Sequence, residues 1–559
     1  MTETPAPRRS TERAGSPVSR RRALGLAALA ASAPALAGCA PKVEPPSSGA
    51  RLVERRLRFG LPAPVFTLDP AVADDIESQR VIRQCVQTLI GTDPATGASA
   101  PRLATSYRLL DGGTSVELRL RSGVEFHDGS RLTAAAVRDT FERLYHLPRE
   151  VYTAHPSNDF RSLFRAHAGE ARSSLYVGCD ILAEDVVVLK TTERIAGLVP
   201  ALSQIGFGIL SPAQTKARRA EGAGLKTAPQ DFTPSGTGPF AVSRVSEKGV
   251  SLTRFQKNQS TPIAATGIDF SVHPDEWERL SALMSGKIDA FDLVTPRMAA
   301  TLARNAQHLQ TRDPYSLLYL GMNAAHPALK SRQVRQLVAQ IVTKQQLVSS
   351  QFLSGTKIAE SFFPPRLGVN NKLFTDPEVP LTQSDAQDAL HKAGYRGEEV
   401  EFVYPTGSPR IYLPYPEKAY AIVARQLQAA GINIKPVPIP WSEGFTTQML
   451  RRRSRGFHLM GLNGGFLDPG YFVNALFMNA REEFGLDSPE LTSRLSAALA
   501  IADPDDRLAA YEKIGNLIAH AVPAVPLVVP VSALASAPDV NGLPASPVLD
   551  EVFSGVRFS

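Results

Sequence analysis

Cysteine is scarce in this chain, with three residues among 559, and this scarcity excludes a fold held together by a disulfide framework. Cys39 ends an apolar N-terminal run, so only Cys85 and Cys179 remain for the folded part. Cys85 stands among aliphatic residues in an expected helix. We therefore expect two independent buried thiols, while a disulfide between them stays an open alternative.

Signatures of metal binding and catalysis are also missing. The ten histidines are scattered, and no pair of Cys or His occurs at ligand spacing, so the sequence predicts no metal and no cofactor. The glycine-rich stretch at 236–240 lacks the Gly-Lys-Ser/Thr of a phosphate-binding loop and favours a plain turn. There is no Gly-x-Ser-x-Gly elbow and no zinc helix motif, which argues against an enzyme. A pair of catalytic carboxylates has no such motif and stays open.

Positive charge is modest once the N-terminal segment is set aside. The formal net charge is +7, and residues 1–38 hold six Arg and two Glu, so +4 belongs to this segment and +3 to the rest. That balance does not predict nucleic-acid binding. One basic run, at 451–455, is expected to be an exposed helix end rather than a phosphate site.

The N-terminus has the pattern of an export signal. Basic residues precede an apolar run of 15 residues at 23–37, shorter than the roughly 20 that a spanning helix needs. The run ends in Leu36-Ala37-Gly38-Cys39, which resembles a lipobox, so we expect a signal peptide at 1–38, lipidation of Cys39 and a tether at 39–52. A buried helix with a structural cysteine is the alternative. The stretch Ser19-Arg20-Arg21 resembles a twin-arginine signal, although Ala23 and Gly25 depart from its usual aromatic residue and lysine.

The clearest local pattern covers residues 115–144. Asp-Gly-Gly at 111–113 favours a hairpin between 106–109 and the following strand. Alternation predicts that this strand is half-buried, with Val116, Leu118 and Leu120 inward. Thr133 is expected to cap a helix that buries one stripe of residues, namely Val137, Phe141 and Leu144.

Residues 101–107 and 120–134 resemble the signature of bacterial extracellular solute-binding proteins, the receptors of peptide, nickel and opine ABC importers. The resemblance implies an α/β, class II periplasmic-binding-protein fold with two main lobes, an inserted subdomain and hinge-bending. His127 and Asp128 of this signature are expected to shape a loop rather than to touch ligand. Where the family usually has an acid after the helix cap, this chain has Ala136, which should weaken the helix start.

The same resemblance sets the expected domain boundaries. They are lobe I at 53–94, 236–318 and 525–559, the inserted subdomain at 95–235, and lobe II at 319–524. Within lobe II, Ser384 and Gln387 have the spacing of a capping box. A strand at 400–404, a helix at 417–430 and a strand at 432–439 follow, and this order predicts parallel strands.

The stretch at 457–472 is the expected ligand loop. Related peptide receptors carry an acid near Gly465 that holds the ligand's α-ammonium, because burying an ammonium without a partner is costly. The resemblance places ligand contacts at Asn463, Gly464, Gly465, Phe466 and Asp468. Asp468 has the alternative of capping the turn before Pro469. With glycine in place of the acid, this loop predicts a preference for ligands that are blocked, neutral or differently charged at that end.

Taken together, the sequence predicts an exported, monomeric substrate-binding lipoprotein of an ABC importer, lipid-anchored to the outer face of the cytoplasmic membrane or in the periplasm. It would capture a peptide or peptide-like solute between two lobes and deliver it to permease subunits, with no cofactor and no nucleic-acid partner. The alternatives are a sensor-type binding protein and a secreted hydrolase.

Overall fold

The computed structural model describes residues 54–155, 158–257, 263–377, 381–478 and 480–559. The expected signal peptide, the expected lipidation site Cys39 and the whole predicted tether lie outside these residues. Within the described part, no helix combines the length and the apolar composition needed to cross a lipid bilayer.

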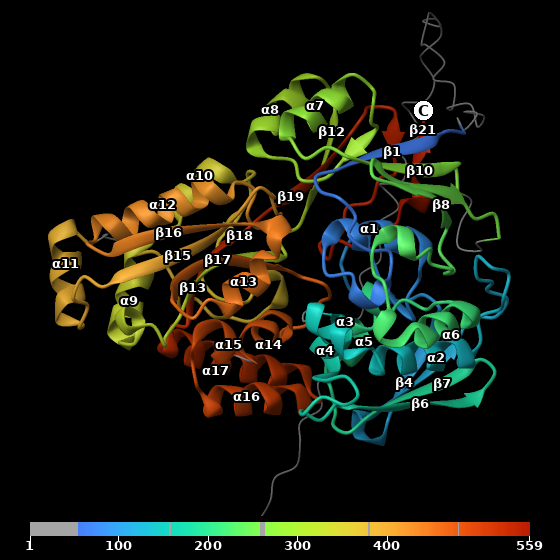
Figure 1. The fold of residues 1–559 in the computed structure, drawn as a ribbon, viewed down its shortest axis with the longest axis horizontal. Coiled ribbons are helices and arrows are strands. Elements are labelled where there is room, and N and C mark those ends of the chain that lie inside the picture. The colour runs from blue at the N-terminus through green and yellow to red at the C-terminus, as the bar shows by residue number, and fades with distance from the viewer. Residues whose placement is uncertain (1–53, 156–157, 258–262, 378–380, 479) are drawn as a thin grey trace, which may run out of the picture. The chain divides into compact units, whose positions relative to one another are not determined.

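Lobe I is built on a mixed sheet that Figure 1 shows in blue, green and red, because its strands come from distant parts of the sequence. In spatial order its seven described strands are β12 (His308–Arg312), β19 (Ser532–Ser536), β11 (Ala290–Phe291), β1 (Arg56–Leu61), β10 (Gly267–Val272), β9 (Gly249–Arg254) and β8 (Phe240–Ser246). The helices of this lobe are α1 (Ile76–Cys85), α7 (Glu276–Met284) and α8 (Pro296–Arg304). A small pair, β20 (Val540–Asn541) and β21 (Arg557–Phe558), closes the C-terminal segment.

The inserted subdomain carries its own antiparallel sheet and its own hydrophobic core. Its described strands are, in order, β4 (Ala104–Leu110), β5 (Ser115–Leu120), β7 (Val186–Thr191) and β6 (Tyr176–Ala183), next to the pair β2 (Ile90–Thr92) and β3 (Ser99–Pro101). Its helices are α2 (Ala134–Tyr145), α3 (Arg149–Ala154), α4 (Asp159–Phe164), α5 (Leu198–Ala201) and α6 (Pro212–Glu221). The predicted hairpin is confirmed by the β4–β5 pairing, and Thr133 caps α2 by accepting from the Ala136 N–H.

Lobe II is organised around a second mixed sheet, drawn in yellow to red in Figure 1. Its described strands are, in order, β14 (Lys357–Ile358), β18 (Ala524–Val529), β13 (Ser316–Met322), β17 (Arg455–Asn463), β15 (Glu399–Thr406) and β16 (Asn433–Pro440). Its helices are α9 (Arg332–Ile341), α10 (Gln345–Gln351), α11 (Gln383–Lys392), α12 (Pro416–Ala429), α13 (Phe445–Arg451), α14 (Tyr471–Phe477), α15 (Ala480–Phe484), α16 (Pro489–Ala500) and α17 (Pro504–Ala521). The predicted parallel pairing of β15 and β16 is confirmed, and both views show α12 against these strands.

Three details of lobe II differ from the sequence-based expectation. The chain was expected to return from lobe II to lobe I at 525, but β18 still pairs with β13 and β14 of lobe II. The chain therefore passes from lobe I to lobe II at 313–315, between β12 and β13, and returns at 530–531, between β18 and β19. The cap of α11 is Thr382, which accepts from the Asp385 N–H, two residues before Ser384. In the basic run, Arg455 is buried and donates to backbone carbonyls, because it is the first residue of β17 and not part of the helix end.

The family signature has a structural role. The backbone N–H of His127 donates to the carbonyl of Gly236 at 2.8 Å, and His127 Nε2 lies 3.1 Å from the carbonyl oxygen of Gly238. A Cβ on Gly236 would approach the Cys85 carbonyl oxygen at 2.3 Å, which explains the glycine. The signature therefore docks the inserted subdomain onto lobe I, as its expected loop-shaping role implies. Cys85 and Cys179 are free and buried in different cores.

Candidate ligand-binding site

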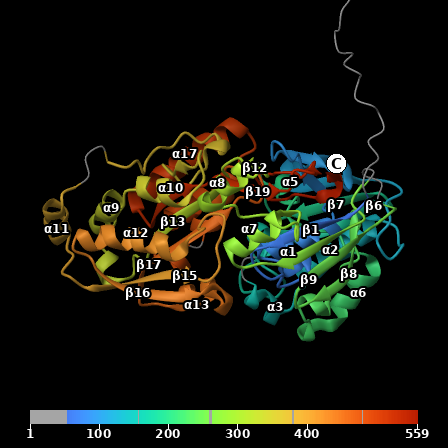
Figure 2. The same cartoon turned by 90° about the horizontal axis from the view of Figure 1, so that it is seen from above.

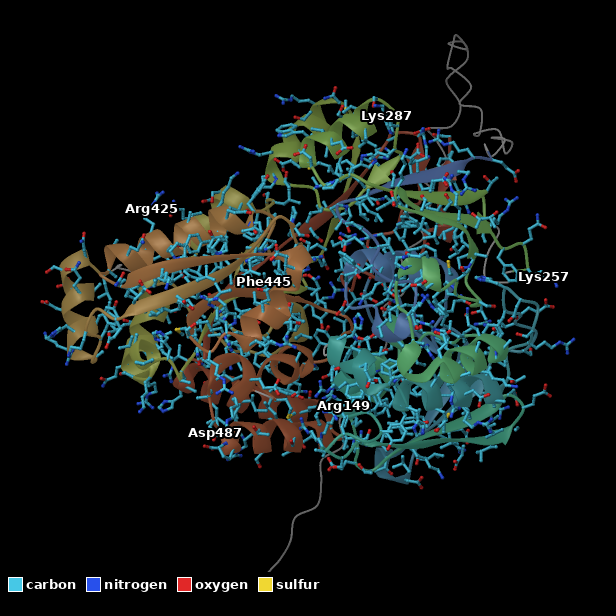
Figure 3. All side chains as sticks on the ribbon, in the orientation of Figure 1. Arg149, Lys257, Lys287, Arg425, Phe445 and Asp487 are labelled. Atoms are coloured by element: carbon cyan, nitrogen blue, oxygen red, sulfur yellow. The ribbon has the colours of Figure 1, made fainter. Side chains whose placement is uncertain are left out.

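A cavity of about 540 Å³ lies between lobe I, the inserted subdomain and lobe II. Lobe I contributes the N-terminal turn of α1, and the inserted subdomain contributes Asp159 and Gln204. Lobe II contributes residues 409–412, the start of α13 with Phe445 (labelled in Figure 3), and residues 460–465 at the end of β17. The volume is within the range of pockets that hold small molecules, about 300–1,000 Å³.

Two buried carboxylates, Asp75 and Glu77, form the lobe I wall of this cavity. Asp75 is the N-cap of α1, and its Oδ1 accepts from the Ser78 N–H at 2.7 Å. Its second oxygen, Oδ2, is buried and has no hydrogen-bond partner among the described residues, and the same holds for Oε2 of Glu77. Burial, together with the nearby Glu77, raises the pKa of the Asp75 carboxyl to about 7.

An ion pair links this wall to lobe II. Nη1 of Arg410 lies 3.5 Å from Oε2 of Glu77, and the Arg410 guanidinium stands over the Trp441 ring, 4.1 Å from its centroid. Burial raises the pKa of the Glu77 carboxyl, although Arg410 opposes the shift. The distance is too long for a hydrogen bond, and Nε of Arg410 also lacks a partner.

Beneath this wall lies a buried network in which every charge is paired. Arg312 Nη1 lies 2.8 Å from Asp292, Arg80 Nη1 lies 3.2 Å from Glu551, and further ion pairs join Arg80 to Asp292 and Arg312 to Glu551. Burial alone would raise the pKa of Asp292, but the guanidinium groups of Arg312 and Arg80 lower it to about 2. We call this network the floor of the site. Its acids are already neutralised by neighbours in the chain, so they offer no free charge to a ligand.

The inserted subdomain adds a third acid. Asp159 accepts from Gln204 Nε2 and from the Gly206 N–H, both at 2.9 Å. Burial raises the pKa of Asp159 to about 6. Gln204 Nε2 also lies 3.0 Å from the place of a Cβ on Gly465, so this amide stands between the acid and the lobe II loop.

Of the predicted site residues, Asn463, Gly464 and Gly465 line the cavity, and Phe466 and Asp468 are not among its lining residues. Asn463 is fixed because its Oδ1 accepts from Ser316 Oγ at 2.9 Å. A Cβ on Gly464 would meet the Tyr315 ring at about 2.0 Å, so the loop needs glycine there.

Asp468 is occupied within the chain. Its Oδ1 accepts from the Gly470 N–H at 2.8 Å, and its Oδ2 lies 3.0 Å from Nη1 of Arg507. These contacts are those of the turn-capping alternative. The Asp468 side chain is buried with its partner rather than turned to the cavity, so it has no free charge to offer there.

Sequence reasoning missed Asp75, Glu77, Arg410 and Asp159. The signal for Asp75 was present, but an aspartate before a helix is explained by capping alone. Arg410 and Trp441 lie in separate segments of lobe II, and only the folded chain brings them to α1. Among the described residues, no group of His, Cys, Asp and Glu is arranged to hold a metal ion.

The match to known proteins agrees with this architecture. Residues 99–483 match the family model described as bacterial extracellular solute-binding proteins, family 5 Middle. The chain belongs to this family of extracellular, non-enzymatic solute-binding proteins, so the hydrolase alternative is excluded.

Individual relatives span most of the chain. The "Probable di/tripeptide-binding protein 5" of Pseudomonas aeruginosa (strain UCBPP-PA14) is 24% identical over 488 residues, 84% of this chain and 89% of its own length. "Heme-binding protein A" of Haemophilus influenzae is 21% identical and covers 82% of this chain and 83% of its own length. Among solved structures, the periplasmic binding protein DppA from Helicobacter pylori, in complex with peptide STSA, superposes with a TM-score of 0.78 at 19% identity. That match covers 91% of this chain and 98% of DppA, and it confirms the predicted fold.

Proposed function

We propose that this protein captures a peptide or peptide-like solute between its lobes and delivers it to the permease of an ABC importer. The observation that carries the proposal is the cavity itself, whose walls come from lobe I, the inserted subdomain and lobe II. Relatives named as peptide-binding proteins support the choice of solute.

Contacts on both sides of the cavity support a closing motion of the lobes. Tyr415 Oη donates to Glu276 of lobe I at 3.0 Å, and the Ala196 N–H of the inserted subdomain donates to the Leu499 carbonyl of lobe II at 2.9 Å. The sheets are joined at 313–315 and 530–531. These two adjacent connections are the hinge, because rotation there opens the cavity without disturbing either core.

A melting screen tests the proposal. The exported part of the chain is heated with peptides, opines, sugars and nickel, each in large excess. A ligand at a hundredfold excess over its Kd stabilises the folded state by about 2.7 kcal/mol. Peptides should raise the Tm, and nickel alone should not. A shift with nickel alone, or with sugars alone, would overturn the proposal.

We further propose that the protein is held at the membrane by lipidation of Cys39. The order Leu36-Ala37-Gly38-Cys39 supports this, because small residues before the cysteine suit the processing of a lipoprotein signal. Cys39→Ala should release the protein into the soluble fraction of fractionated cells, while Cys85→Ala should not. Membrane retention of the Cys39 variant would contradict the anchor.

A further inference from the structure

The lobe I wall presents two carboxylate oxygens that accept no hydrogen bond from the described residues, although Oε2 of Glu77 has an ion-pair partner in Arg410, 3.5 Å away. Asp75 is 9% exposed and Glu77 is 2% exposed, yet Oδ2 of Asp75 and Oε2 of Glu77 accept no hydrogen bond. Both residues line the cavity. A buried polar atom without a partner is costly, and native structures keep few of them. The cost is recovered if a donor on the ligand reaches these oxygens.

We propose that Asp75 and Glu77 form a subsite for a cationic group of the ligand, either a primary ammonium or a guanidinium. The proposal rests on the proposed function, since it names the chemical class of solute that the same cavity takes. Such a group carries only donors and positive charge, which is what two carboxylate oxygens that lack a hydrogen-bond donor require.

The chain itself shows that this wall accepts a cation. The Arg410 guanidinium faces Glu77 at 3.5 Å and stands on the face of Trp441. A carboxylate on one side and an indole face on the other are a recurring environment for organic cations. Arg410 makes no hydrogen bond to Glu77, however, so the carboxylate keeps its capacity to accept one from a ligand.

Charge around the cavity favours the same class of ligand. Asp292 and Arg80 neutralise each other in the floor, and Arg410 offsets Glu77. Of the other described lining residues with a formal charge, Asp74, Asp75 and Asp159 are acidic and Arg83 is basic. This excess of negative charge attracts cations and disfavours anions.

Titration of Asp75 gives the subsite a measurable signature. The charged and titratable groups around it are Glu77, Asp74 and Arg80 on its own segment, Arg410 from lobe II, Asp292 from the floor, and His155, whose Nδ1 lies 3.6 Å from Asp74. With the pKa of Asp75 raised to about 7, the ligand-free site holds part of a proton at neutral pH. A bound cation favours the ionised carboxyl and should expel that proton.

Three synthetic peptide pools, matched in length from three to five residues and all amidated at the C-terminus, test the proposal. The first has a free amino end, the second is N-acetylated and neutral, and the third is N-acetylated with one lysine or arginine. Each pool is incubated with the protein, and retained peptides are counted by mass spectrometry after gel filtration. Retained peptides are then titrated by calorimetry in two buffers of different ionisation enthalpy, which counts released protons.

The expected result is retention of at least one cationic pool, about a hundredfold weaker binding of the neutral pool, and release of protons near pH 7. Asp75→Asn keeps a capping oxygen and should remove both the preference and the proton release. The matched control is Asp275→Asn, which alters the N-cap of α7 outside the cavity and should behave like the wild type.

The other outcomes each decide against the proposal. Equal retention of the neutral pool would overturn the cation subsite and leave the peptide-binding function standing. An unchanged preference in folded Asp75→Asn and Glu77→Gln variants would overturn the assignment to this wall. Retention of none of the three pools, with no peptide shift in the melting screen, would overturn the proposed function as well.

Discussion

The lobe I wall of the cavity carries several charged side chains, whereas the lobe II wall is built mainly of uncharged groups. Asp75 and Glu77 face the cavity from α1, while lobe II offers Asn463, Gly464 and Gly465, and Arg410 is its charged member among the described lining residues. A solute between the lobes touches both walls at once. Charge recognition can therefore reside on either wall, and a missing acid on one does not exclude a cationic ligand.

A second contrast lies within lobe I itself. Asp292 and Glu551 are buried with two arginines and are fully paired, whereas Asp75 and Glu77, a short distance along α1 from Arg80, are buried with oxygens left over. Buried carboxylates therefore have two different roles in lobe I. Fully paired acids in the floor stabilise the fold, whereas Asp75, for which no ion pair is described, reduces stability unless a ligand is present. Substitutions in the two sets should have opposite effects.

The largest effect is expected for Asp292→Asn. Removing this acid leaves Arg80 and Arg312 buried with Glu551 as their remaining partner, and breaking such a network costs about 3–5 kcal/mol of unfolding free energy. Denaturant unfolding at pH 7 measures it. The control is Asp185→Asn, which breaks an exposed pair with Arg119 and should cost less than about 1 kcal/mol. A similar loss in both variants would contradict the distinction between floor and surface.

The opposite sign is expected for Asp75→Asn in the ligand-free protein. The pKa of Asp75 rises on folding from 3.8 to about 7, so its contribution to stability is present below the lower value and is lost as pH rises towards 7. Asparagine cannot ionise, so the stability gain of the variant over the wild type should be larger at pH 8 than at pH 5 by about 1–3 kcal/mol. Unfolding curves at both pH values test this. A stabilisation that is equal at the two values would show that ionisation is not the cause.

A smaller effect is expected for Gly465→Asp, which places an acid on the lobe II wall. A Cβ there lies 3.0 Å from Gln204 Nε2 and 3.1 Å from Tyr471 Oη, which is a tight fit; the Gln204 amide is the nearest donor to the new carboxylate, because Tyr471 already donates to the Asn463 carbonyl. If the ligand's cation binds at Asp75, its affinity should change by less than about tenfold, or 1.4 kcal/mol. Calorimetry with a free-amine peptide and its acetylated form measures the change. A gain of several decades for the free amine would place the ammonium at the lobe II loop instead.

The sequence predicted those parts of the fold that depend on local pattern. Alternation and turn residues located the β4–β5 hairpin, and Thr133 located the start of α2. Strand, helix and strand in that order predicted the parallel pair β15 and β16. The predicted boundary at 525 was wrong, because a buried aliphatic strand such as β18 fits either sheet and only its pairing decides between them.

The site was harder to predict, since its charges are assembled from distant segments. Asn463, Gly464 and Gly465 were found through a resemblance to relatives, and they do line the cavity. Asp75 and Glu77 have an ordinary local explanation as a helix cap and an acid in the first turn. Their role depends on burial by lobe II and on Arg410, which follows them by more than 300 residues. Local pattern holds no information on such a contact.

The smallest effect on binding is expected for Asp468→Asn. Asp468 lies near the lobe II loop, but its oxygens are taken by the Gly470 N–H and by Arg507, and it is not among the residues that line the cavity. Its loss should lower the Tm, because Arg507 loses a largely buried partner. The affinity of the folded variant for a cationic peptide should stay within about threefold of the wild type, since 0.6 kcal/mol is near the limit of such comparisons. Calorimetry well below the Tm separates the two effects. A loss of binding comparable to that of Asp75→Asn would show that Asp468 leaves Arg507 when ligand enters, and the cation would then belong to lobe II.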